Sequence, residues 1–96
     1  MQANYQARWI SKDRLREIRK TGSLSQGLLL DSFNGWIMIE PAGRDLGDGE
    51  IMSAETADYE LDPAWCPGSK AKLKVARKLL GLAEEPTGKL VGASEG

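Results

Sequence analysis

Two apolar runs flank an Asn-Gly pair in residues 28–40, which read Leu28-Leu29-Leu30-Asp31-Ser32-Phe33-Asn34-Gly35-Trp36-Ile37-Met38-Ile39-Glu40. An Asn-Gly pair between such runs is typical of a two-residue type I′ turn, because both central positions of that turn need a positive φ. The sequence therefore predicts a β-hairpin that turns at Asn34-Gly35. The expected pairs across it are Phe33 with Trp36, Ser32 with Ile37, and Leu30 with Ile39.

A ten-residue pattern occurs twice in the chain, at residues 11–20 and again at 69–78. Each copy begins with a Ser that can cap a helix, has Leu at its fifth position and ends in Arg-Lys. We therefore predict two short helices, at about 12–21 and 70–80, with Gly22 and Gly81 at their C-terminal ends. At about 100° per residue, four cations of each helix fall on one stripe. These are Lys12, Arg16, Arg19 and Lys20 in the first helix, and Lys70, Lys74, Arg77 and Lys78 in the second.

The segments around the hairpin complete a small α+β domain. Residues 4–10 predict a first strand, and residues 62–68 predict a rigid turn. Residues 50–61 leave two alternatives open, which are one or two further strands or a short helix capped by Ser53. The predicted fold is thus a small antiparallel sheet built on the 28–40 hairpin and flanked by two short basic helices. One domain over residues 1–83 is followed by a flexible tail over 84–96.

The net charge of −1 conceals a strong separation of charge along the chain. Residues 12–20 carry five bases and two acids, and residues 70–78 carry five bases and no acid. Between them, residues 40–62 carry eight acids against one base, a net charge of −7. The eight acids are Glu40, Asp45, Asp48, Glu50, Glu55, Asp58, Glu60 and Asp62.

Catalytic and metal-binding patterns are absent from the sequence. The chain has no His, which is the commonest general base near neutral pH, and it carries no nucleophile elbow, phosphate-binding loop or dinucleotide fingerprint. Cys66 is the single cysteine and has no histidine to activate it. Residues 45–50 contain three acids and two glycines, but they lack the spacing of a calcium loop. We therefore predict no enzymatic activity, no cofactor and no metal.

The cellular compartment is predicted from two other features of the sequence. The first five residues lack the apolar core of a signal peptide, and the longest aliphatic or aromatic run, Trp36–Ile39, is far shorter than a membrane span. We therefore expect a cytoplasmic protein that does not enter a membrane.

The basic helices carry the leading functional hypothesis. Lys70 and Lys72 lie in the first turn of their helix, where the helix dipole disfavours cations, and residues 70–83 hold no acid to compensate them. This placement favours a non-enzymatic binding or regulatory module that binds DNA or RNA, mainly through phosphates. A solvated helix face that balances the acidic segment is the simpler interpretation of the same charges.

The acidic segment supports an alternative function. Its eight carboxylates could form a protein-interaction surface that imitates a nucleic acid, as in an inhibitor, with an acidic or basic protein surface as the partner. Opposite charges on one chain also allow a self-complementary homodimer. Phe33 and Trp36 are expected on one hairpin face, either as a core pair or as an exposed stacking platform.

Overall fold

The computed structural model describes residues 4–24 and 27–86, and it shows a small α+β fold. The elements in chain order are β1 (Tyr5–Ile10), α1 (Lys12–Thr21), β2 (Leu28–Ser32), β3 (Gly35–Pro41), α2 (Ala54–Glu60) and α3 (Lys70–Leu79). The strands form one antiparallel sheet in the order β1-β3-β2. The predicted fold class is confirmed. Residues 87–96, which make up most of the predicted tail, lie outside the described residues. Pro86, the last described residue of the predicted tail, is buried.

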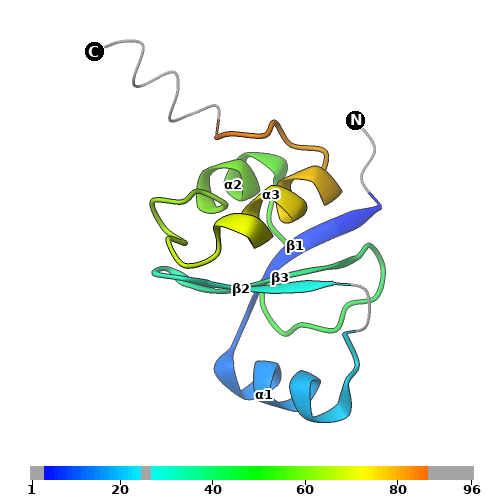
Figure 1. The fold of residues 1–96 in the computed structure, drawn as a ribbon. Coiled ribbons are helices and arrows are strands. Elements are labelled where there is room, and N and C mark those ends of the chain that lie inside the picture. Colours follow the sequence, from blue (N-terminus) through cyan, green and yellow to red (C-terminus); the bar gives the residue numbers. More distant parts are fainter. Residues whose placement is uncertain (1–3, 25–26, 87–96) are drawn as a thin grey trace, which may run out of the picture.

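The sheet lies between two helical layers, with α1 on one face and α2 and α3 on the other (Figure 1). The central strand alternates between two cores. Ile37 and Ile39 pack with residues of α2 and α3, whereas Met38 packs with Leu15 and Ile18 of α1. A strand buried on both faces needs an unbroken apolar sequence, which explains the run from Trp36 to Ile39.

The first helix begins and ends where its sequence predicts. The Ser11 hydroxyl accepts a hydrogen bond from the Arg14 N–H, and Gly22 has the left-handed conformation at φ 67°. Ile10, just before the cap, and Leu15 in the helix belong to the same core, which is the arrangement of a hydrophobic staple.

The second copy of the repeated pattern folds differently at its start. Ser69 precedes α3, but its side chain makes no capping hydrogen bond, so the predicted cap is wrong there. Gly81, at φ 74°, follows the helix as predicted. Residues 54–60 form the short helix, whose cap is the Ser53 hydroxyl accepting from the Thr56 N–H. The alternative of strands is wrong apart from one isolated bridge between Ile51 and Arg8.

The hairpin is present, but its turn lies one residue earlier than predicted. Ser32 pairs with Gly35 and Leu30 pairs with Ile37, so Phe33 and Asn34 form the turn. Gly35 has a φ of 136°, whereas Asn34 is not among the residues with positive φ. Each residue of β2 thus pairs with the residue of β3 two positions before its predicted partner. Because side chains alternate with a period of two, this shift leaves the strand residues on their predicted faces of the sheet.

Long-range contacts explain the shift. The Phe33 N–H donates to the Trp65 carbonyl at 2.9 Å, and the Asn34 amide donates to Glu60 Oε1 at 2.9 Å. The Ser32 hydroxyl also accepts from the Asn34 N–H at 3.1 Å. The first two bonds hold the tip against α2 and the 62–66 turn, and together with the local Ser32 bond they outweigh the preference of Asn-Gly for a type I′ turn.

Replacing Gly35 by Val should lower the free energy of unfolding by about 1–3 kcal/mol, because a β-branched residue resists a positive φ. A Cβ at this position would also lie 3.3 Å from ring atoms of Trp9. Urea unfolding measures the change, and Phe33→Val is the matched control at the exposed neighbouring turn position. Equal stability of the two variants would contradict this account of the turn.

Candidate basic interface

The solvent face of α3 carries a row of three lysines at intervals of four residues, Lys70, Lys74 and Lys78. All three side chains are exposed, and no acid occurs on this helix. Lys72 is also exposed but points toward the sheet, where its ammonium group donates to the Leu29 carbonyl at 3.1 Å. We call the three lysines of the solvent face the α3 row.

Arg77 does not belong to this surface, which corrects its predicted place on the cationic stripe. It is only 2% exposed, and its guanidinium lies between α3, the end of α2 and the segment after α3. Nη1 donates to the carbonyls of Asp58 and Leu61, Nη2 pairs with the Asp58 carboxylate, and Nε donates to the Ala83 carbonyl. The last carbonyls of a helix need donors, and a planar guanidinium can satisfy several at once.

Arg77→Met should destabilise the fold by about 3 kcal/mol or more, because it removes the buried guanidinium that donates to the Asp58 carboxylate and to three backbone carbonyls. Lys78→Met, which removes a neighbouring exposed cation, should change stability by less than about 0.5 kcal/mol. Urea unfolding of the two variants provides the comparison. Similar stabilities would show that Arg77 does not hold α2 and α3 together.

The cations of α1 are exposed as predicted, but acids and an aromatic ring accompany them. Arg16 pairs with Asp13 at 3.4 Å, and the Arg19 guanidinium carbon lies 5.3 Å from the centre of the Trp36 ring. Lys12 and Lys20 are exposed at either end of the helix. The first basic stripe is therefore partly neutralised by acids of its own helix, whereas α3 carries no acid and Glu84, beyond its end, lines a hollow together with Lys74 and Lys78.

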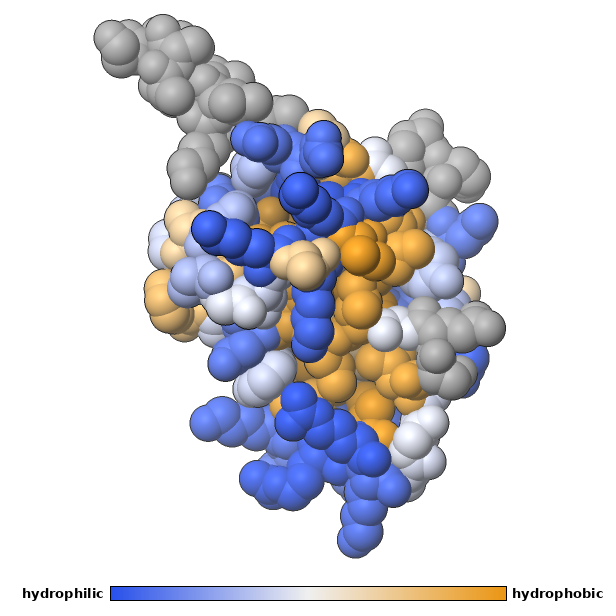
Figure 2. Space-filling view, in the orientation of Figure 1, coloured by the Kyte–Doolittle hydropathy of each residue, from blue (hydrophilic) through white to orange (hydrophobic). Residues whose placement is uncertain are grey.

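The two basic helices lie on opposite faces of the sheet (Figure 1), and both contribute a residue to the outer edge of β2. A groove of about 350 Å³ lies there, lined by Arg19 from α1 and Lys72 from α3. Between these cations it is lined mostly by apolar side chains, and its other lining residues are Ile18, Gly22, Leu24, Gly27, Leu28 and Leu29. Figure 2 shows the result as an apolar strip between an upper and a lower hydrophilic region. We call this feature the β2-edge groove.

Three of the eight predicted acidic site residues serve the fold and not an exposed surface. Glu40 is fully buried at the end of β3, where its carboxylate accepts from the Leu46 N–H at 2.9 Å and from the Gln6 amide at 2.7 Å. Asp62 is buried and accepts from the Ala64 N–H at 2.8 Å. Asp58 pairs with Arg77. These three residues therefore do not contribute to the acidic interaction surface that the alternative function requires.

The other acids of the segment are divided among different places. Glu50 and Glu55 are exposed, and Glu60 is half-buried and bonded to Asn34. Asp45 lies 3.5 Å from an Arg8 nitrogen, and Asp48 accepts from both the backbone N–H and the hydroxyl of Ser11. Residues 45–50, which lack the spacing of a calcium loop, thus hold the loop after β3 against β1 and α1.

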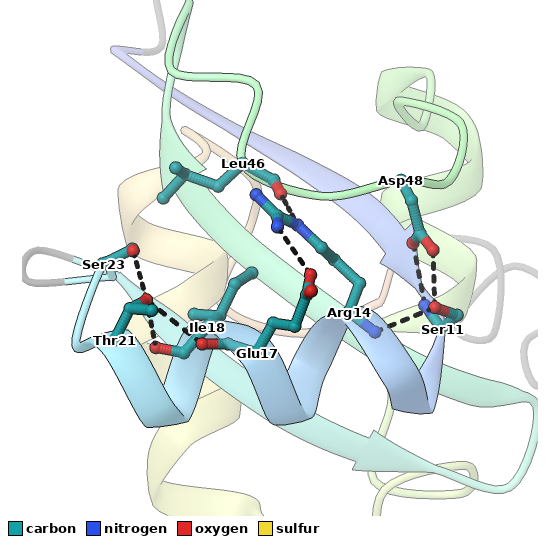
Figure 3. A network of polar contacts seen from close by, with 8 residues as sticks. All are labelled: Ser11, Arg14, Glu17, Ile18, Thr21, Ser23, Leu46 and Asp48. Carbon is teal, nitrogen blue, oxygen red and sulfur yellow. Dashed lines mark hydrogen bonds and ion pairs between the residues drawn. The ribbon is translucent and has the colours of Figure 1, made fainter.

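Figure 3 shows how that loop is attached to α1. Arg14 Nε donates to the Leu46 carbonyl at 2.6 Å, while its Nη1 donates to Glu17 at 2.9 Å. Asp48 meets Ser11 at the start of the helix. Hydrogen bonds from the Ser11 hydroxyl and then the Ser11 N–H lower the pKa of Asp48 below its ordinary value of 3.8.

Asp48→Asn should weaken the loss of stability in acid. A carboxyl whose pKa is lowered by folding stabilises the fold above its unfolded pKa, and this contribution disappears as the pH falls through the lower folded value. The variant should therefore show a shallower decline in melting temperature below about pH 4. Ser11→Ala should flatten the decline as well, since it removes the hydroxyl donor. An unchanged slope in Asp48→Asn would contradict this assignment.

The aromatic residues do not form the predicted hairpin pair. Phe33 is 74% exposed in the turn, whereas Trp36 packs beside the α1 core. Tyr59 and Trp65 form a tilted pair instead, with ring centres 5.7 Å apart. No local pattern indicated this pair, because it joins α2 to the following turn.

Residues 4–24 and 27–86 contain neither an activated thiol nor a cluster of metal ligands. Cys66 is fully buried, and burial raises the pKa of its thiol, which keeps the sulfur protonated near neutral pH. No three His, Cys, Asp or Glu side chains gather as a metal site in residues 4–24 and 27–86. In the same part of the chain, no helix has both the length and the apolar character needed to cross a bilayer.

Comparison with known proteins gives no relative from which a function could be transferred. No protein-family model, no curated protein and no solved structure matches this chain.

Proposed function

We propose that this chain is a non-enzymatic, cytoplasmic binding module that binds DNA or RNA through its basic helices. The observation that carries the proposal is the α3 row, Lys70, Lys74 and Lys78, which is exposed and faces no acid on its own helix. Like charges four residues apart destabilise a helix by a few tenths of a kcal/mol per pair. A bound polyanion would remove this repulsion.

The start of α3 adds to the attraction. Ser69 leaves the first N–H groups of the helix without a side-chain cap, and Lys70 lies beside them. Free N–H groups and nearby cations together suit a phosphate oxygen. Contacts would be mainly to the nucleic-acid backbone, since no motif that reads base edges is present.

The α1 cations should contribute less. Asp13 and Glu17 reduce the charge of that helix, and Arg19 is engaged with Trp36. The alternative function through the acidic segment has less support, because Glu40 and Asp62 are buried and Asp58 is paired.

The test is the salt dependence of binding to a short fluorescent oligonucleotide, single-stranded or duplex, followed by anisotropy. Three to four phosphate contacts should give a log–log slope of about −2 to −4. Reversal of the α3 row in Lys70→Glu/Lys74→Glu/Lys78→Glu should weaken binding at least about tenfold and flatten the slope. Arg77 stays unchanged in this variant because its loss would disturb the fold.

The matched control is Lys12→Glu/Arg16→Glu/Lys20→Glu, which changes the net charge equally on α1. Its affinity should fall less than that of the α3 variant. Equal losses would mean that both helices contribute alike and would overturn the ranking. No binding to either oligonucleotide at low salt would overturn the proposed function.

A further inference from the structure

The outer edge of β1 is covered by another segment of the chain, whereas the outer edge of β2 is open. The outer edge of β1 is covered by residues 50–52, where the Trp9 N–H donates to the Glu50 carbonyl at 3.1 Å and the Met52 N–H donates to the Ala7 carbonyl at 2.8 Å. Within the described residues, no backbone group bonds to Leu29 or Asp31 on the outer side of β2, and the Trp65 carbonyl accepts from the Phe33 N–H just beyond the end of the strand. An uncovered edge can pair with another strand.

The register identifies the backbone groups on the open edge. The backbone N–H and C=O groups of Ala7 and Trp9 point away from β3. Ile39 and Ile37, which pair with these two residues, therefore direct their own backbone groups toward β2. Those two residues pair with Leu28 and Leu30, and the intervening residues Leu29 and Asp31 therefore point their N–H and C=O groups outward. The bond from Lys72 to the Leu29 carbonyl agrees with this assignment.

The side chains around this edge indicate the chemistry of a partner. Leu24, Leu28 and Leu29 form a half-buried apolar floor, while Arg19 and Lys72 supply positive charge from the two sides. Figure 2 shows this apolar strip between the hydrophilic regions of α3 and α1. Asp31 lies at the other end of the strand and does not line the groove.

We propose that the β2-edge groove binds an extended peptide in which pairs of acidic residues alternate with pairs of apolar residues, so that each face of the added strand carries both kinds of side chain. The peptide would add a fourth strand beside β2, with its backbone paired to Leu29 and Asp31. Its apolar side chains would cover the leucines, and its carboxylates would pair with Arg19 and Lys72. An incoming N–H would replace the Lys72 ammonium on the Leu29 carbonyl and release it for a carboxylate. Strand addition of this kind takes affinity from main-chain bonds and specificity from alternate side chains.

The other possible occupants fit this groove less well. A nucleic acid would use the cations but leave the leucine floor and the outward N–H groups unmatched. A second copy of the chain would bring its own Arg19 and Lys72 toward those of the first, and like charges across an interface oppose binding. The proposal concerns a surface beside the α3 row and does not depend on nucleic-acid binding.

Amide hydrogen exchange followed by NMR tests the proposal on the full chain. In the free protein, the amides of Leu29 and Asp31 should exchange much faster than those of Leu28 and Leu30, which face β3. The probe, called the Glu-Val peptide, is a synthetic capped peptide that repeats Glu-Glu-Val-Val, and the control, called the Lys-Val peptide, repeats Lys-Lys-Val-Val. The Glu-Val peptide should slow exchange at Leu29 and Asp31 at least about tenfold, and the Lys-Val peptide should not.

Two sets of variants separate backbone pairing from charge. Leu29→Pro removes an outward donor without removing a bond to β3, whereas Leu29→Ala keeps the donor and loses the side chain. The Pro variant should abolish binding, and the Ala variant should retain part of it. Arg19→Glu/Lys72→Glu should weaken binding at least about tenfold more than Lys12→Glu/Lys78→Glu, which makes the same change in charge away from the groove.

Several outcomes would overturn the proposal. They are fast exchange at Leu29 and Asp31 that the Glu-Val peptide leaves unchanged, equal binding of the two peptides, and protection of the same amides by self-association or by an oligonucleotide alone. If Leu29→Pro does not fold, the exchange data and the charge variants still decide the question. Loss of oligonucleotide binding in the α3-row variant, with peptide binding retained, would show that the two surfaces are separate.

Discussion

The burial of β3 on both faces and along both edges is the constraint from which the rest of the structure follows. Its apolar side chains alternate between two cores, so each face of the sheet needs its own helical cover. This requirement places α1 on one side and α2 with α3 on the other (Figure 1). The two basic helices are therefore separated by the thickness of the sheet, and Arg19 and Lys72 from these helices line one groove at the outer edge of β2.

Two buried charged residues then hold the helices and the loop after β3 against the sheet. Arg77 joins the end of α2 to α3, which matters because a helix of seven residues has little stability of its own. The Glu40 carboxylate accepts hydrogen bonds from Gln6 of β1 and from Leu46 in the loop after β3. Removing one partner of such a buried group costs much more than removing an exposed charge. By holding α3 in one rotation, Arg77 also directs Lys70, Lys74 and Lys78 outward.

The surface that results from this arrangement combines exposed cations with an open strand edge. The α3 row has no acids on its helix, and the neighbouring edge offers leucines and outward backbone groups. Both features suit anionic partners, but of different chemistry. Phosphates need only charge and donors, whereas an acidic strand also uses apolar cover and backbone pairing. One small domain can therefore present two adjacent binding surfaces.

The sequence alone determined the elements whose signals are local. Ser11 and Gly22 delimit α1, the apolar runs form the hairpin, and residues 12–21 and 70–79 become helices because capping and periodicity act within a few residues. Tertiary contacts decided the turn register, the choice of helix over strand at 54–60, and which charges are buried. Arg77 and Lys78 are adjacent and equally cationic in the sequence, yet one is buried and the other exposed. The groove also required tertiary structure, since Arg19, Leu29 and Lys72 come from three elements distant in the chain. Pairing and burial of this kind depend on the neighbours that folding brings together, which no local pattern records.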